Sequence, residues 1–163
     1  MGIPLPDPIG HSGNLGLLFE EHANEDRPAL IDLRDKKKSH IITYNELDTC
    51  CNAVARGLTK RGLKPGNRIG ILSLNRIEFI STLLGAMRAG VIPVPMNVKL
   101  PAHIISYIIK DANIKLLFAE TTFKQLFPLN IQTIEFDSSF DEFLDFGPFE
   151  AFDPTPDSIA VQP

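Results

Sequence analysis

The sequence predicts an α/β fold with a doubly wound, mostly parallel sheet flanked by helices and a small N-terminal hairpin. Three observations lead to this prediction. Short apolar runs typical of strands alternate with amphipathic helical segments from position 41 onward. Units of strand, helix and strand connect parallel strands through right-handed crossovers. Two further apolar runs, earlier in the chain, flank a turn of three lysines, and this arrangement is typical of a hairpin.

The N-terminal part begins with an extended segment. Residues 1–13 are rich in proline and glycine, which predicts a flexible lead-in. Asn14 is predicted to cap a short helix. One face of that helix would be formed by Leu15, Leu18 and Phe19. The hairpin strands are predicted over 29–33 and 40–43, and the lysine run 36–38 is interpreted as a solvated tip rather than a binding patch.

A longer helix is predicted directly after the hairpin. Thr43-Tyr44-Asn45-Glu46 matches the capping box, in which a threonine and a glutamate three residues later satisfy each other's backbone N–H groups. Apolar side chains then recur at helical spacing and form one face: Leu47, Cys51, Val54 and Leu58. Cys51 is therefore interpreted as a core residue, and Gly62 is expected to end the helix.

The same alternation continues to position 136. Residues 68–73 predict a strand, and Asn75 with Glu78 is expected to cap the next helix, which Gly90 ends. A strand over 91–95 contains two prolines, which demand an edge or a strand end. The remaining predicted elements are a helix from Pro101 to the stop at Asn113, a strand over 115–119, a short helix over 122–127 and a strand over 132–136.

The segment 137–163 differs in composition. Residues 125–163 carry eight acidic and no basic side chains, whereas the net charge of the whole chain is −4. Phenylalanine recurs every three residues, at positions 140, 143, 146, 149 and 152. Prolines exclude a long helix, so a short helix at about 139–146 and an extended segment are predicted. We expect the phenylalanines to pack on a surface; the alternative is an acidic-aromatic interaction motif.

Composition excludes several classes of function. An acidic chain without a large basic face argues against nucleic acid as a partner. No uncharged stretch approaches the roughly 20 apolar residues of a membrane-spanning helix. The two cysteines, Cys50 and Cys51, are adjacent and cannot form the set of disulfide bonds that stabilises a small secreted domain. This indicates a reducing compartment and favours a cytoplasmic location.

The search for reactive groups gives no site residues. The chain contains no glycine-rich phosphate loop of the GxGxxG or GxxxxGK[ST] type and no GxSxG elbow. The cysteines and histidines lack the spacing of metal ligands. We therefore assign no catalytic, cofactor-binding or metal residue. Asn97 and Lys99 are the only weak candidates, because they follow a predicted strand and α/β sheets bind ligands at strand carboxyl ends.

Four segments follow one another along the chain: Ile42-Thr43-Tyr44-Asn45-Glu46-Leu47, Gly62-Leu63-Lys64-Pro65-Gly66-Asn67-Arg68-Ile69, Leu74-Asn75-Arg76-Ile77-Glu78-Phe79 and Gly85 to Asn97. In this order they resemble the adenylate-forming enzymes, the superfamily of acyl- and aryl-CoA synthetases, luciferases and peptide-synthetase adenylation domains. The run Val94-Pro95-Met96-Asn97-Val98-Lys99-Leu100 is closer to the acyl-CoA synthetase branch than to peptide synthetases.

The resemblance implies an activity for a parent enzyme. Such enzymes convert a carboxylic acid and Mg-ATP into an acyl-adenylate and then a thioester with CoA. The motifs that perform this chemistry are absent here, so 14–136 is interpreted as an N-terminal subdomain and 137–163 as an extended segment leading toward a missing phosphate loop. The chain alone would bind no cofactor and be inactive, and its partners would be the remaining subdomains.

Two questions stay open at this point. The alternative function is a non-catalytic binding module that docks through the acidic, phenylalanine-rich tail. The oligomeric state is also open, with a homodimer as one alternative. The acyl substrate and the acceptor thiol do not follow from these residues.

Overall fold

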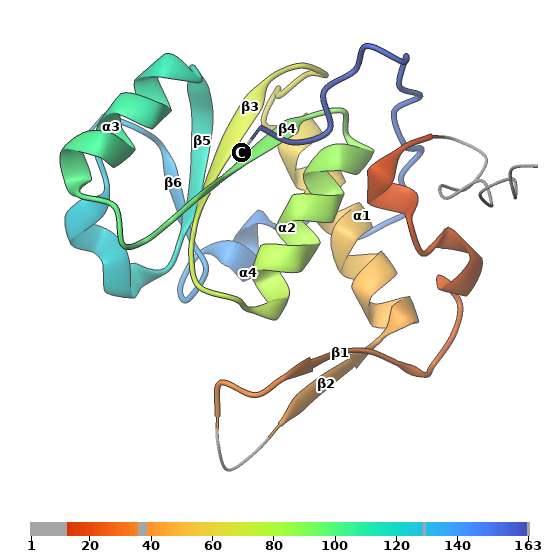
Figure 1. Ribbon diagram of the computed structural model, residues 1–163. Helices are drawn as coiled ribbons and strands as arrows, with labels where there is room; N and C mark the ends of the chain where they lie inside the picture. Colours follow the sequence, from red (N-terminus) through yellow and green to blue (C-terminus); the bar gives the residue numbers. More distant parts are fainter. Residues whose placement is uncertain (1–12, 36–38, 129, 163) are drawn as a thin grey trace, which may run out of the picture.

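A four-stranded parallel sheet forms the centre of the computed structural model, which describes residues 13–35, 39–128 and 130–162. Its strand order is β4-β3-β5-β6 (Figure 1). The strands are β3 (Arg68–Leu72), β4 (Ile92–Met96), β5 (Ile114–Ala119) and β6 (Thr133–Glu135). The predicted fold class is confirmed. The lead-in, apart from its last residue, and the lysine tip at 36–38 lie outside the described residues.

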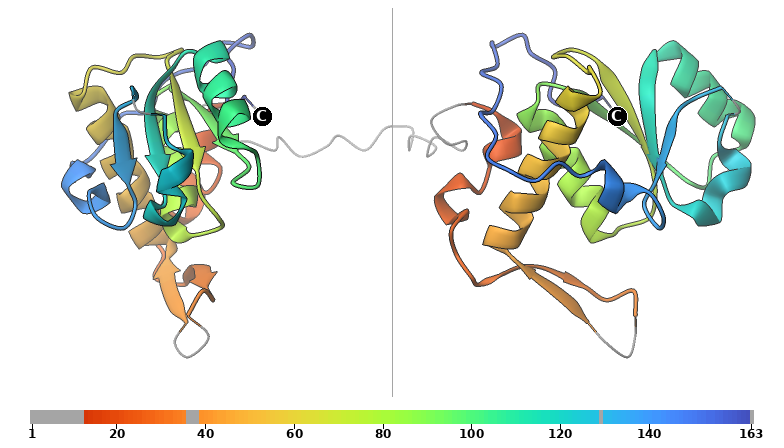
Figure 2. Two further views of the ribbon diagram at one scale, coloured as in Figure 1. Left: turned by 90° about the vertical axis from the view of Figure 1, so that its left-hand side faces the viewer. Right: turned by 180° about the vertical axis from the view of Figure 1, so that it is seen from behind.

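Helices cover both faces of this sheet. The helices are α1 (Tyr44–Lys60), α2 (Ile77–Arg88), α3 (Ala102–Asp111) and α4 (Phe140–Phe143), with a 3-10 helix η3 at Thr121–Leu126 in place of the predicted helix over 122–127. Side chains of α1, α2 and α4 pack with the sheet in one apolar cluster, and those of α3 and η3 pack in another. The two sides are separated in the edge-on view of Figure 2. The helices that follow the strands lie on both faces, which makes the sheet doubly wound.

The hairpin of β1 (Pro28–Asp32) and β2 (His40–Thr43) is a separate two-stranded sheet that projects from the body (Figure 1). Its antiparallel register places Leu30 opposite Ile42, and Ile31 opposite Ile41. Ile42 is buried against the base of α1, whereas Ile31 and Ile41 on the other face are 57% and 47% exposed. The hairpin therefore buries one face only.

The chain before the hairpin is held by Asn14. Its side chain accepts a hydrogen bond from the Gly16 amide and so caps the 3-10 helix η1 (Leu15–Leu17), as predicted. A second 3-10 helix, η2, covers Glu20–His22. The predicted shared face is wrong in part: Phe19 is buried, but Leu18 is 58% exposed. The tighter 3-10 turn rotates successive side chains by more than an α-helix does, so Leu18 leaves the buried face.

Helix α1 begins with the predicted capping box. The Glu46 amide donates to Thr43 Oγ1, and the Thr43 amide donates to the Glu46 carboxylate. Cys51 lies fully buried between α1 and α2, and burial raises the pKa of its thiol to about 12. The helices approach closely because Gly85 has no side chain: a Cβ there would lie 2.6 Å from the Cys51 carbonyl oxygen.

Helix α2 starts differently from the prediction. Its N-cap residue is Arg76, not Asn75, and the cap position makes no side-chain hydrogen bond to the helix. Glu78 instead accepts two hydrogen bonds from the Arg76 guanidinium. A charged guanidinium binds a carboxylate more strongly than a neutral amide N–H does, and this pairing displaces the expected capping box.

Strand β4 lies at the edge of the sheet, as its prolines predict. The Ile92 amide donates to Asn67 on the inner side, and the Pro93 carbonyl accepts a hydrogen bond from the Gln162 amide on the outer side. Alternate residues of a strand point to opposite neighbours, so Pro95 also faces outward. Both residues that face outward therefore have a carbonyl group and no N–H group.

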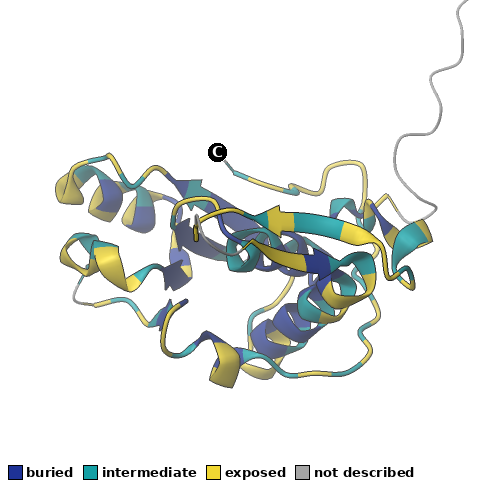
Figure 3. Cartoon of the chain, turned by 90° about the horizontal axis from the view of Figure 1, so that it is seen from below, coloured by how far each residue is buried: buried dark blue, intermediate teal, exposed yellow. Residues whose placement is uncertain are grey.

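The acidic segment after 136 joins the core. Phe140 and Phe143 on α4 are buried with Phe118 of β5 and Phe136, whereas Phe146 is 61% exposed. Figure 3 shows how buried stretches (dark blue) and exposed stretches (yellow) are distributed over the whole chain. The expectation that the phenylalanines pack on a surface holds for Phe140 and Phe143, and Phe149 is partly buried against the same cluster. No helix among the described residues is long and apolar enough to cross a membrane.

Candidate functional site at the carboxyl edge of the sheet

The carboxyl ends of the parallel strands meet at the edge of the sheet that faces the hairpin (Figure 1). Strand β3 continues into α2 on one face, while its neighbours β4 and β5 continue into α3 and η3 on the other. Open α/β sheets bind ligands where neighbouring strands diverge in this way. The topology thus places the candidate site between the loops that follow β3, β4 and β5.

A cleft of about 580 Å³ lies at this point. It is lined by Arg34, Ser73, Leu74, Asn75, Phe79, Pro95, Met96, Asn97, Val98 and Glu120. Strands β3, β4 and β5 are directly followed by the lining residues 73–75, 97–98 and 120, respectively. Arg34 comes from the hairpin. The cleft is therefore assembled from parts of the chain that are far apart in sequence, which is typical of a site at a sheet edge.

Glu120 joins two of the loops. One of its carboxylate oxygens accepts hydrogen bonds from Ser73 Oγ at 2.6 Å and from the Leu74 amide at 2.8 Å. The Glu120 amide donates in turn to the Leu72 carbonyl. These bonds hold the loop after β5 against the loop after β3, so they fix the floor of the cleft.

Arg34 is the cation of the cleft, and it is already paired. Its guanidinium lies 2.6 Å from one Asp32 carboxylate oxygen and 3.7 Å from Glu78. The hydrogen bonds that Arg34 donates to the Asp32 carboxylate lower the pKa of Asp32 and raise the pKa of Arg34. Arg34 therefore stays charged and oriented by the hairpin.

A network around the buried Arg76 adjoins the cleft. The side chain of Arg76 is 5% exposed and binds Glu78 at 2.8 Å and Asp137 at 2.8 Å. Asp137 also accepts from the Thr121 amide, and the Arg76 guanidinium lies 5.1 Å from the centre of the Phe136 ring. One guanidinium thus links the loops after β3, β5 and β6, which gives the carboxyl edge a fixed shape.

Acid is expected to weaken this network. Burial raises the pKa of Glu78, but hydrogen bonds from Arg76 outweigh it and leave that pKa below its usual value; the pKa of Asp137 is lowered in the same way. A carboxyl with a lowered folded pKa contributes stability that is full above its unfolded pKa and is lost as the pH falls through its folded pKa. We expect the urea midpoint to decline below about pH 4.5.

The variant Arg76→Met checks this prediction. It removes the cation that lowers both pKa values, so it should be less stable at pH 7 and its urea midpoint should depend less on pH below 4.5 than that of the unmodified chain. Lys99→Met, which changes an exposed cation outside the network, is the control and should keep the original slope. An unchanged slope in Arg76→Met would contradict the proposed role of the network.

The two candidates from sequence fall in different places. Asn97 lines the cleft, and its Oδ1 accepts a hydrogen bond from the Lys99 amide at 2.9 Å. Lys99 is exposed and is not among the lining residues. Sequence reasoning missed Arg34, Ser73 and Glu120. Ser73 and Glu120 directly follow strands, so the rule that selected Asn97 could have found them, whereas no sequence signal brings Arg34 of the hairpin to this edge.

The cleft can orient a polar ligand, but it does not fit a triphosphate with its metal. Its cation is held by Asp32, and the Glu120 carboxylate would repel phosphate oxygens. Within 13–35, 39–128 and 130–162, no cluster of three histidine, cysteine or acidic side chains could hold a metal ion.

Comparison with known proteins gives three related findings. The family model described as "AMP-binding enzyme" matches residues 19–158. Gramicidin S synthase 2 of Brevibacillus brevis is 33% identical over 110 residues, covering 66% of this chain and 2% of that protein. The 3-hydroxybenzoate–CoA ligase of Aromatoleum sp. (strain CIB) is 30% identical over 102 residues, covering 63% of this chain and 18% of the ligase.

Solved structures show the same fold. The long-chain-fatty-acid–CoA ligase of Archaeoglobus fulgidus superposes with a TM-score of 0.78 at 19% identity, covering 87% of this chain and 32% of the ligase. O-succinylbenzoate coenzyme A synthetase of Bacillus subtilis, in complex with AMP, superposes with a TM-score of 0.71 at 25% identity, covering 87% of this chain and 36% of the synthetase. The chain thus spans about a third of these solved relatives and under a fifth of the curated ones.

Proposed function

The chain belongs to the AMP-binding enzyme family, and from this premise we propose that it is the N-terminal subdomain of an ATP-dependent acyl-CoA synthetase. The parent enzyme would convert a carboxylic acid and Mg-ATP into an acyl-adenylate and then into a CoA thioester. The observation that carries the proposal is the family match over 19–158, together with the fold that the chain shares with several CoA ligases.

The acyl-CoA branch rests on the segment 94–100. Val94-Pro95-Met96-Asn97-Val98-Lys99-Leu100 resembles that branch, and four of its residues line the carboxyl-edge cleft: Pro95, Met96, Asn97 and Val98. A second candidate is the adenylation domain of a peptide synthetase, because five of the curated relatives with 30–33% identity are peptide synthetases. Both candidates share acid activation and differ in the acid and in the acceptor thiol.

In this proposal the chain contributes part of the wall of a ligand route and no catalytic group. The carboxyl-edge cleft would form one wall of a ligand route, with Asn97 facing it, and the remaining subdomains would supply the groups that bind ATP, Mg and CoA. The 163-residue chain alone is therefore expected to show no acid-dependent exchange of pyrophosphate into ATP. Measurable exchange by the purified chain would contradict this division of roles.

The experiment compares this chain with the polypeptide encoded by its natural gene. The reading frame is sequenced past the codon for Pro163, and both proteins are assayed for pyrophosphate exchange with fatty, aryl and amino acids, and then for thioester formation with CoA. Exchange by the longer protein alone, with CoA as acceptor, supports the proposal. Stimulation by amino acids without CoA thioester favours the peptide-synthetase candidate, and a stop codon after Pro163 overturns both.

The alternative of a binding module is tested by the tail. Phe140 and Phe143 are buried within this chain, so a docking surface would have to use the exposed Phe146 and the half-buried Phe149 and Phe152. If the alternative were right, a specific partner would be retained by the unmodified chain and lost on Phe146→Ala with Phe149→Ala.

A further inference from the structure

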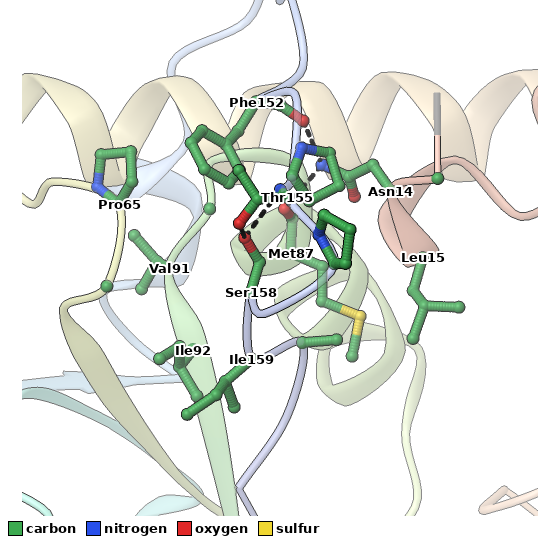
Figure 4. Close-up of a pocket in the computed structure, with 16 residues that line it drawn as sticks. Asn14, Leu15, Pro65, Met87, Val91, Ile92, Phe152, Thr155, Ser158 and Ile159 are labelled. Atoms are coloured by element: carbon green, nitrogen blue, oxygen red, sulfur yellow. Dashed lines mark hydrogen bonds between the residues drawn. The ribbon is translucent and has the colours of Figure 1, made fainter. Parts of the chain in front are cut away.

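A second cavity lies at the opposite, amino edge of the sheet (Figure 4). Its volume is about 650 Å³, within the range of roughly 300–1,000 Å³ that is usual for small-molecule sites. Residues 152–160 form one wall. The other walls come from Asn14 and Leu15, from the turn at Pro65 and Gly66, and from the stretch Met87 to Ile92 at the end of α2 and the start of β4.

The wall 152–160 is fixed at both ends. At one end, the Phe152 amide donates to the Arg88 carbonyl at 2.7 Å, and Asn14 Nδ2 donates to the Phe152 carbonyl at 2.8 Å. At the other end, the Gln162 amide donates to the Pro93 carbonyl, and Gln162 Oε1 accepts from Arg68 Nε at 2.8 Å. The segment that forms this wall is therefore anchored on both sides of the cavity.

The spanning segment is stiff between these anchors. Pro154 and Pro156 fix their backbone φ angles, and the Ser158 hydroxyl accepts from the Thr155 amide at 2.9 Å and lies 3.1 Å from Thr155 Oγ1 (Figure 4). A preformed wall loses little conformational entropy when a ligand enters, because the wall is already ordered.

The lining determines what the cavity can accept. It contains no charged side chain, and most of its surface is carbon from Met87, Val91, Ile92, Phe152, Pro154 and Ile159. Its polar side chains are Asn14, Thr155 and Ser158, and all three make hydrogen bonds within the chain. An ionised ligand would lose its hydration without gaining a counter-charge, whereas a neutral apolar ligand would gain from burial.

We propose that this cavity is a binding site for a neutral, largely apolar small molecule. The site lies at the edge of the sheet opposite to the cleft that the proposed function uses, so binding here does not depend on acid activation. Occupancy would tie the segment 152–160 to the end of α2 and the start of β4. It is therefore expected to stabilise that segment.

The test uses N-phenyl-1-naphthylamine, a neutral fluorescent probe, titrated into the 163-residue chain. We expect saturable binding of one probe per chain. Ala160→Phe fills the cavity and should weaken binding at least about tenfold, whereas Ala102→Phe, which adds the same ring at the exposed start of α3, should leave binding unchanged. Circular dichroism and urea midpoints confirm that both variants are folded.

Four results would overturn the proposal. The first is that the unmodified chain shows no saturable binding. The second is loss of the probe on Ile31→Thr with Ile41→Thr but not on Ala160→Phe, which would place the probe on the exposed face of the hairpin. The third is equal affinity for the anionic probe 1-anilinonaphthalene-8-sulfonate, which would contradict a neutral ligand. Probe release accompanied by dimer formation in sedimentation would assign the cavity to a second copy of the chain, and this too would overturn the proposal.

Discussion

Replacing Phe143 by alanine is expected to lower the free energy of unfolding by about 3–5 kcal/mol. The ring is 1% exposed and lies edge-on to Phe118 with 4.9 Å between ring centres. The Arg61 guanidinium lies 4.4 Å from the centre of the same ring. Gly57 of α1 has no side chain at this contact; a Cβ there would lie 3.0 Å from the ring and 2.6 Å from the Phe143 carbonyl oxygen. The truncation would therefore leave a cavity that the rigid helix and sheet cannot close.

The matched control is Phe146→Ala, three residues further along. Phe146 is 61% exposed, so the free energy of unfolding should change by no more than about 0.5 kcal/mol. Urea unfolding followed by circular dichroism measures both variants. Similar small effects for the two positions would mean that α4 does not pack in the core, and the acidic tail would again be a candidate for docking.

Replacing Arg88 by methionine is expected to cost roughly 3 kcal/mol of unfolding free energy. The side chain is 1% exposed near the end of α2 and joins three segments. Its Nε donates to the Gly16 carbonyl at 2.8 Å, and one terminal nitrogen contacts Asp48 at 2.8 Å and Asn52 at 2.7 Å. Methionine keeps much of the buried volume, but it leaves these oxygens without their donor.

Two further variants separate the contribution of the Arg88 charge to the free energy of unfolding from the contribution of its packing. Arg27→Met changes a 56% exposed arginine in a surface pair, and its effect should stay within about 1 kcal/mol. In the Arg88→Met background, Asp48→Asn removes the uncompensated carboxylate and should restore part of the loss. If the second change restored nothing, the effect of Arg88 would come from packing and from the Gly16 and Asn52 hydrogen bonds alone.

Periodic patterns and turn residues made the fold predictable. The spacing of Leu47, Cys51, Val54 and Leu58 identified the buried face of α1, and all four side chains are buried. The prolines of β4 predicted its edge position. The predicted start of α2 was wrong because the observed start depends on the pairing of Arg76 with Glu78 and Asp137. Asp137 is 61 residues away from Arg76 in sequence. Local rules do not contain such a contact.

The candidate site was less predictable than the fold. Asn97 was found because it follows a strand, and the same rule covers Ser73 and Glu120. The presence of Arg34 depends on where the hairpin lies relative to the sheet, which is a tertiary property. The amino-edge cavity depends on contacts between residues such as Asn14 and Phe152, 138 positions apart, and no motif in the sequence indicates them.

The outer edge of β4 is chemically one-sided. Pro93 and Pro95 have no N–H group to donate, and the Pro93 carbonyl already accepts from the Gln162 amide, so a strand that approaches cannot have its own carbonyls satisfied at these two residues. A regular intermolecular ladder therefore cannot grow from this edge, although it is the boundary of an otherwise parallel sheet. Restoring one donor with Pro95→Val would weaken this protection, and the variant should form thioflavin-positive aggregates at lower concentrations than the unmodified chain does.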